Sequence, residues 1–244
     1  MGVPVTYRGI ILSSHEAKDK DRILKFLTKE NGLLDIYAKG TGKLGSINAF
    51  ISVPFMLCDL TVSDSHGYLY LRSGVIVESN SRIMNDLDAI TAASHIGDIL
   101  SEMSRQSDNS SEAYEIGVYS YYYLSSDVSR WKLITALFNW RVLSVMGYTV
   151  RYSVTNDTGS RIEDNGLYYL STSGGDVYSG RKGDHGFCLM SGTSIAALNY
   201  ISDCGLKDLF LMNCSESLTD KLFNFTLRYM SYQLEKNYLE RFEL

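Results

Sequence analysis

The 244-residue chain has few of the features that mark exported or membrane-bound proteins. It has only two prolines, so no proline-rich linker separates domains. No apolar run reaches the ~18 residues that a membrane helix needs, and the first residues lack the pattern of a signal peptide. None of the four cysteines forms a C-x-x-C pair, so we expect reduced and mostly buried thiols, with a disulfide or metal role as the lesser alternative. We therefore expect a cytoplasmic protein without membrane contact.

The sequence also lacks the common catalytic motifs. It contains no G-x-S-x-G, no H-E-x-x-H and no Walker sequence. The four histidines lie in four unrelated contexts: His15, His66, His95 and His185. Asp86 and Asp88 lie at a predicted helix start, where carboxylates favour the positive end of the helix dipole, so we interpret them as capping residues. We expect a protein that is not an enzyme and that needs no cofactor.

The net charge of −5 excludes a wholly basic nucleic-acid coat, but the charge is unevenly distributed. Residues 1–82 carry ten Lys/Arg against eight Asp/Glu, a net charge of +2. Residues 83–244 carry 13 Lys/Arg against 20 Asp/Glu, a net charge of −7. The difference indicates either a fluctuation on a solvated surface or an anion-facing N-terminal module on an acidic body.

The hydrophobic pattern changes period near residue 80. Strand-like segments come first: 5–14, 22–29, 33–38, 50–62 and 68–78. Ile23, Phe26 and Leu27 would also fit a short helix, but Asn31-Gly32 is a strong hairpin signal and favours a strand. Five strands in about 80 residues are typical of an OB-type barrel.

Helical periodicity follows the predicted barrel. The expected helices are 84–105, 112–124, 129–146, 193–201 and 216–242, and Gly147 occupies a C-cap position. The stretch between them is irregular, with strand-like pieces at 167–170 and 187–190. We predict an α+β fold of three parts: an OB domain (1–80), a helical domain (81–147 and 191–244) and an irregular insert (148–190).

An OB barrel binds single strands with a basic groove and with aromatic side chains that stack on bases. The candidate DNA-binding residues are Arg8, Lys18, Lys20, Arg22, Lys25, Lys39 and Lys43. The alternative is that these side chains are merely solvated, with their charge partly cancelled by Glu16, Asp19 and Asp21. Lys39 and Lys43 flank a Gly-rich loop that lacks the P-loop spacing.

Aromatic residues allow two interpretations. In the barrel, Tyr7 and Tyr37 could stack on bases or pack inward, whereas Phe26 is the better core candidate. The tyrosine-rich segment 114–123, with Trp131 and Trp140, is typical of helix-bundle core; partner binding is the alternative.

The order of motifs resembles the RecO family of bacterial recombination mediators. The matching pieces are Arg8-Gly9-Ile10-Ile11-Leu12, Asp21-Arg22-Ile23, Thr28-Lys29-Glu30-Asn31-Gly32, Ala38-Lys39-Gly40 and Leu143-Ser144-Val145-Met146-Gly147-Tyr148. The resemblance implies an OB domain, a helical domain and a zinc-finger-like insert. It also implies binding to single- and double-stranded DNA, annealing of complementary strands, and recombinase loading in recombinational repair, with RecR as a partner. We accordingly expect the protein to be associated with the nucleoid.

The chain departs from the family at the expected zinc ligands. Many members carry C-x-x-C-G after Gly-Tyr and a second C-x-x-C after Gly-Gly. The equivalent positions here are Thr155, Thr158, Tyr178 and Arg181, and these are not the usual N/S ligands of zinc. We predict an insert without a metal, held by packing alone.

The resemblance further implies recognition of the acidic, Phe-ended tail of single-stranded-DNA-binding protein. Such a tail needs an apolar pocket with a basic rim in the helical domain, and Arg130, Lys132 and Arg141 are the candidates there. Two hypotheses stay open: a RecO-like mediator that binds DNA through its barrel, and a protein-interaction scaffold with little intrinsic DNA binding.

Overall fold

The computed structural model describes residues 2–41, 49–106, 110–180, 183 and 186–243. The chain forms two compact units, Met1–Ser129 (unit 1) and Arg130–Leu244 (unit 2). The barrel and the first two helices together form unit 1, whereas the predicted helical domain contains those helices together with the later ones. The division into three functional domains stays a prediction.

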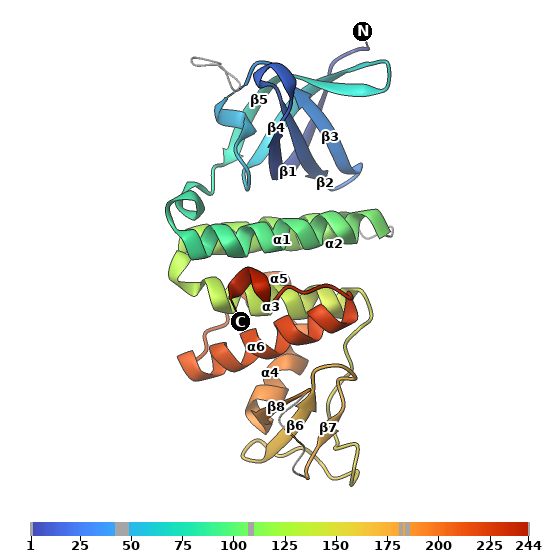
Figure 1. Ribbon diagram of the computed structural model, residues 1–244, viewed down its shortest axis with the longest axis vertical. Coiled ribbons are helices and arrows are strands. Elements are labelled where there is room, and N and C mark those ends of the chain that lie inside the picture. Colours follow the sequence, from blue (N-terminus) through green and yellow to red (C-terminus); the bar gives the residue numbers. More distant parts are fainter. Residues whose placement is uncertain (1, 42–48, 107–109, 181–182, 184–185, 244) are drawn as a thin grey trace. The chain divides into compact units, whose positions relative to one another are not determined.

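A closed barrel forms the first part of unit 1 (Figure 1). Its strands are β1 (Val5–Glu16), β2 (Arg22–Thr28), β3 (Gly32–Ala38), β4 (Leu57–Ser65) and β5 (Tyr68–Glu78). They follow the order β1-β2-β3-β5-β4, and the contact of β3 with β5 is parallel. The predicted OB-type barrel and α+β class are confirmed. The predicted strand 50–62 begins only at Leu57, because Phe50–Ser52 forms a 3-10 turn.

The β2–β3 hairpin shows why the strand prediction for 22–29 is correct. Gly32 has φ +63°, which favours glycine, and the Thr28 hydroxyl donates to the Gly32 carbonyl at 3.0 Å. Alternate residues of β2 then point inward, so that Leu24 and Phe26 are fully buried in the barrel core. Phe26 is therefore a core residue, as expected.

Two helices of unit 1 pack side by side against the barrel, α1 (Leu87–Gln106) and α2 (Ser110–Ser126) (Figure 1). Asp86 caps α1 as predicted, because its carboxylate accepts the Ala89 N–H at 2.8 Å. Gly97 allows α1 to approach β1 and α2 closely, because a Cβ at this position would lie 3.0 Å from both the Leu12 carbonyl oxygen and the Tyr121 hydroxyl. The helices are thereby held to β1 through a tightly packed contact.

Unit 2 combines helices with a small sheet. Its helices are α3 (Trp131–Val145), α4 (Gly192–Asp203), α5 (Leu206–Leu211) and α6 (Glu216–Gln233). Its strands are β6 (Leu167–Ser171), β7 (Val177–Tyr178) and β8 (Phe187–Ser191), in the order β7-β6-β8. The last predicted helix ends at Gln233 rather than at 242, and α5 and β7 have no counterpart in the predicted elements.

Trp140 lies at the core of unit 2. Its indole N–H donates to the Leu198 carbonyl at 2.8 Å, and its ring packs against Phe225 and Tyr229. The core role predicted for this tryptophan is confirmed. The C-cap residue of α3 is Met146, and Gly147, the predicted C-cap, follows it with φ +80°. Within the described ranges, no helix has the length and apolar character that crossing a bilayer requires.

Candidate nucleic-acid interface

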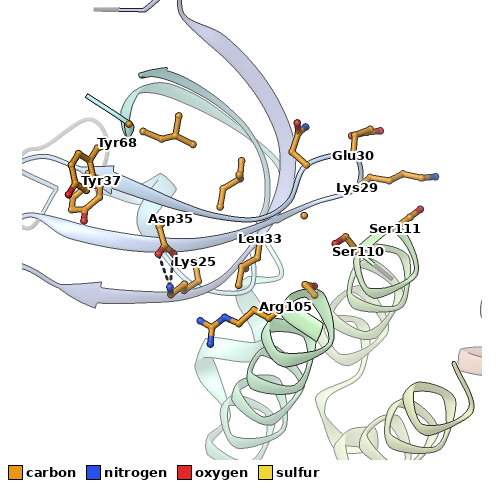
Figure 2. A pocket seen from close by; sticks show the side chains of 16 residues that line it. Lys25, Lys29, Glu30, Leu33, Asp35, Tyr37, Tyr68, Arg105, Ser110 and Ser111 are labelled. Carbon is orange, nitrogen blue, oxygen red and sulfur yellow. Dashed lines mark hydrogen bonds and ion pairs between the residues drawn. The ribbon is translucent and has the colours of Figure 1, made fainter. Parts of the chain in front are cut away.

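An open groove of about 860 Å³ runs along the β2–β3 hairpin to the neighbouring ends of α1 and α2 (Figure 2). The hairpin contributes Lys25 and the stretch from Lys29 to Asp35, and the β4–β5 turn contributes Gly67 and Tyr68. Arg105 of α1 and the first residues of α2 complete the lining. The groove is therefore built from strands and helices of unit 1 that approach each other only in the fold.

Three tyrosines cluster at the barrel end of the groove. The Tyr37 ring lies 5.5 Å from that of Tyr68, edge to face, and 5.7 Å from that of Tyr70. The parallel pairing of β3 with β5 sets Tyr37 opposite Tyr70. Lys39 lies over the Tyr70 ring, 4.7 Å from its centroid, in a cation–π contact. Tyr68 is 53% exposed, so its ring is accessible to a base.

Of the predicted stacking residues, only Tyr37 belongs to this cluster. Tyr7 is partly buried against the barrel core. The predicted stacking residues do not include Tyr68 and Tyr70. Their spacing of two on the predicted strand 68–78 places both side chains on one face of the strand, and this pattern is visible in the sequence.

Four of the predicted DNA-binding cations come together at the end of the barrel near this cluster. Arg22 lies opposite Ala38 in the β2–β3 register. Because Ala38 directly precedes Lys39 in the sequence, Arg22 and Lys39 lie at the same end of the barrel. The Gly40 N–H donates to the Asp21 carboxylate at 2.6 Å, which ties the turn carrying Lys18 and Lys20 to the end of β3. Lys18, Lys20 and Lys39 are exposed, whereas Arg22 is half-buried. The seventh candidate, Lys43, lies outside the described residues.

Arg22 has a structural role as well. Its Nε donates to the Ser14 hydroxyl at 2.6 Å, and its Nη2 donates to the Ser14 carbonyl at 3.1 Å. The guanidinium therefore joins β2 to β1 while keeping donors at the basic end of the barrel.

The remaining two candidates are ion-paired. Lys25 Nζ lies 2.6 Å from the Asp35 carboxylate, as the dashed lines of Figure 2 show. Arg8 forms a bidentate ion pair with Asp59, with N–O distances of 2.7 and 2.8 Å. This pair joins β1 to β4 and does not line the groove. This hydrogen-bonded pair raises the pKa of Arg8 and lowers that of Asp59. Such pairs on exposed surface contribute little to stability, so a phosphate can compete for the cation.

Two cations of the groove were absent from the predicted set. Lys29 is ion-paired with Glu115 of α2 at 2.7 Å, and this pair raises the pKa of Lys29. Arg105 extends from α1 toward the Lys25–Asp35 pair (Figure 2) and has no ion pair within the described part of the chain. No local pattern marks Arg105, because only the packing of α1 against the barrel brings it to the groove.

A separate apolar pocket of about 220 Å³ lies between the barrel and α2. Leu57, Val77 and Val118 line it, together with Tyr122. A polar hollow of about 230 Å³ shares Tyr122 and contains Arg82. The predicted core role of the tyrosine-rich helix is confirmed for Tyr121, which is fully buried. Tyr122 is 51% exposed and lines a pocket, and partner binding there stays a prediction.

The three predicted partner-binding cations all bind groups within unit 2. Arg130 donates to the Met212 carbonyl at 2.7 Å and Arg141 to the Ser202 carbonyl at 2.9 Å, near the ends of α5 and α4. Lys132 is ion-paired with Asp220 at 2.7 Å. A role in partner binding stays a prediction for these residues.

The donors in the insert do not fit zinc. The hydroxyls of Thr155 and Thr158 lie 2.8 Å from each other and share a hydrogen bond, and the Tyr178 hydroxyl donates to Asp176 at 3.4 Å. Arg181 lies outside the described residues. Across the described chain, no group of three or more His, Cys, Asp or Glu side chains could hold a metal ion.

Cys58, buried in the barrel core, has its pKa raised to about 12 by burial.

Comparison with known proteins gives consistent matches over both units. Residues 1–80 match the family model "Recombination protein O N terminal", and residues 84–241 match "Recombination protein O C terminal". The "DNA repair protein RecO" of Acetivibrio thermocellus is 28% identical over 232 residues, which cover 94% of this chain and 92% of that protein. The protein of the same name from Clostridium acetobutylicum is 20% identical over 94% of this chain and 92% of its own length.

Proposed function

Because the chain belongs to the RecO family of DNA repair proteins, we propose that it is a recombination mediator that binds DNA through the groove of unit 1. The observation that carries this proposal is the Tyr37–Tyr68–Tyr70 cluster with Lys39 beside it, continuous with a groove that contains Lys25 and Arg105. No catalysed reaction is part of the proposal.

The aromatic cluster supports binding of a single strand. Unpaired bases stack on exposed tyrosine rings, a contact that tolerates any sequence because every base has a π-face. The cations at the barrel end and in the groove then neutralise successive phosphates, which makes binding depend on salt. Duplex DNA, whose bases are already stacked, uses only the phosphate contacts and is bound less tightly.

Annealing follows from the same contacts. Neutralised phosphates reduce the repulsion between two complementary strands. A strand held by its backbone, with only some bases stacked on tyrosine, leaves other base edges open for pairing. We propose that the protein brings complementary strands together in this way.

The proposal includes two protein partners. We propose that RecR and the acidic C-terminal tail of single-stranded-DNA-binding protein recruit this chain to coated DNA, where it helps to load recombinase on the nucleoid in the cytoplasm. For the tail, the apolar pocket beside Tyr122, with Arg82 in the adjoining hollow, offers the apolar anchor and the basic rim. Arg130, Lys132 and Arg141 remain alternative contacts, although each would first have to leave its present partner.

The same pocket supports the second candidate function, a protein-interaction scaffold with little DNA binding. Three cations of unit 1 are already ion-paired: Arg8, Lys25 and Lys29. In addition, residues 83–244 carry a net charge of −7, which repels DNA. Both features would weaken DNA binding at cellular salt.

The test is fluorescence anisotropy of a labelled single-stranded oligonucleotide at low and near-physiological salt, followed by addition of the unlabelled complement. The mediator predicts binding that weakens as salt rises and duplex formation faster than that of the free strands. Absence of binding at low salt would overturn the mediator and leave the scaffold. The variant Tyr122→Ala should retain DNA binding and lose the tail peptide.

A further inference from the structure

Two turns of the insert lie against each other in unit 2. The first turn, residues 153–162, is closed by hydrogen bonds from the Thr155 N–H to the Ser160 carbonyl and from the Gly159 N–H to the Thr155 carbonyl, both at 2.9 Å. The second turn, residues 176–180, contains the short strand β7. Zinc-finger-like inserts hold two such turns together through a metal, but the donors here do not fit one.

Asn156 joins the first turn to the second through its backbone and its side chain. Its N–H donates to the Val177 carbonyl at 2.6 Å, and its Oδ1 accepts the Val177 N–H at 2.8 Å. Its Nδ2 donates to the Asp176 carboxylate at 3.0 Å. Asn156 therefore satisfies both backbone groups of Val177 as a neighbouring strand would.

Asp157 makes the second connection. Its carboxylate accepts the Ser179 N–H at 3.1 Å and the Gly180 N–H at 3.0 Å, and the Ser179 hydroxyl also donates to it. Two successive backbone N–H groups that converge on one anion form a strong, charge-assisted arrangement. The bonds from Gly180 and Ser179 lower the pKa of Asp157, so the carboxylate is charged at neutral pH.

We propose that Asn156 and Asp157 form a side-chain staple that joins the two turns in place of a metal ion. The Thr155 and Thr158 hydroxyls, at two of the expected ligand positions, bond to each other within the first turn. The contacts between the two turns come instead from Asn156 and Asp157. The staple also revises the expectation that packing alone holds the insert. The insert is then ordered independently of divalent metals and of any DNA bound to unit 1.

The test compares Asp157→Ala with Asp164→Ala in the full-length chain by amide hydrogen exchange. Asp164 is a matched control, because it is an exposed aspartate of the same insert whose side chain makes no hydrogen bond to the described residues. We expect the Ser179 and Gly180 amides to exchange at least tenfold faster in Asp157→Ala, and at the wild-type rate in Asp164→Ala. Asp157→Asn, which keeps one acceptor oxygen, should be intermediate and serves as the readout if Asp157→Ala does not fold.

Metal dependence is tested on the same wild-type protein. We expect no bound zinc by elemental analysis, and a melting temperature that neither EDTA nor added zinc changes. One equivalent of zinc, or a fall of several degrees in EDTA, would overturn the proposal. Wild-type exchange rates at Ser179 and Gly180 in both Asp157 variants would overturn it as well.

Discussion

The salt dependence of single-strand binding tests the proposed interface most directly. Five cations of unit 1 lie at the barrel end or in the groove without an ion pair among the described residues: Lys18, Lys20, Arg22, Lys39 and Arg105. If each contacts one phosphate, the slope of log K against log salt is about −3.5, because single strands give about −0.7 per contact. Affinity should then fall by roughly 130-fold between 50 and 200 mM salt.

The perturbation is the double variant Lys39→Gln/Arg105→Gln, which removes one cation from each end of the site. The slope should become about −2.1, and the same rise in salt should cost only about 18-fold in affinity. Lys221→Gln is the matched control, because Lys221 is an exposed lysine of α6 in unit 2. Anisotropy titrations at four or more salt concentrations give the slopes. A slope in the double variant equal to that of the wild type, or an equal change in Lys221→Gln, would refute the reasoning.

Three further predictions concern unit 1. Tyr68→Ala should weaken single-strand binding by about 1–3 kcal/mol through lost stacking while duplex affinity holds, as measured by competition anisotropy; equal losses for both would contradict a stacking role. Phe26→Ala should lower the free energy of unfolding by about 3–5 kcal/mol through the cavity left in the barrel core, and a loss under 1 kcal/mol in urea melts would exclude a core position. Asp59, whose pKa is lowered by Arg8, stabilises the fold above its unfolded pKa of about 3.9, and this contribution is lost as pH falls through the folded pKa. The melting temperature of Asp59→Asn should therefore lie slightly below that of the wild type at pH 7, because an exposed pair contributes little, and the gap should close as the pH falls below about 4; a gap that persists in acid would contradict the ion pair.

The proposed DNA-binding groove and the proposed partner pocket are separate sites of the same unit. The aromatic cluster and the apolar pocket beside Tyr122 are both in unit 1, but they have no lining residue in common. Variants at Tyr68 and at Tyr122 can therefore separate the two activities within one unit. Such a separation would distinguish the mediator from the scaffold without truncating the chain.

Local sequence determined the elements that depend on short-range chemistry. The Asn31-Gly32 turn, the Asp86 cap and the Gly147 helix end each follow from the conformational preference of a few neighbouring residues. The pattern of five strands in the first 80 residues was sufficient to predict the barrel, and the order of the motifs was sufficient to identify the family. The burial of Phe26 follows from the alternation of β2, which a strand pattern already contains.

Only the tertiary structure decided which cations and aromatics share a site. Lys25 and Arg8 have the same formal charge as Lys39, yet carboxylates of a neighbouring strand pair with both of them. Arg105 reaches the groove because α1 packs on the barrel, and the staple at Asp157 meets Ser179 across 22 residues of chain. These contacts join residues far apart in sequence, so their partners are set by packing, which no local pattern encodes.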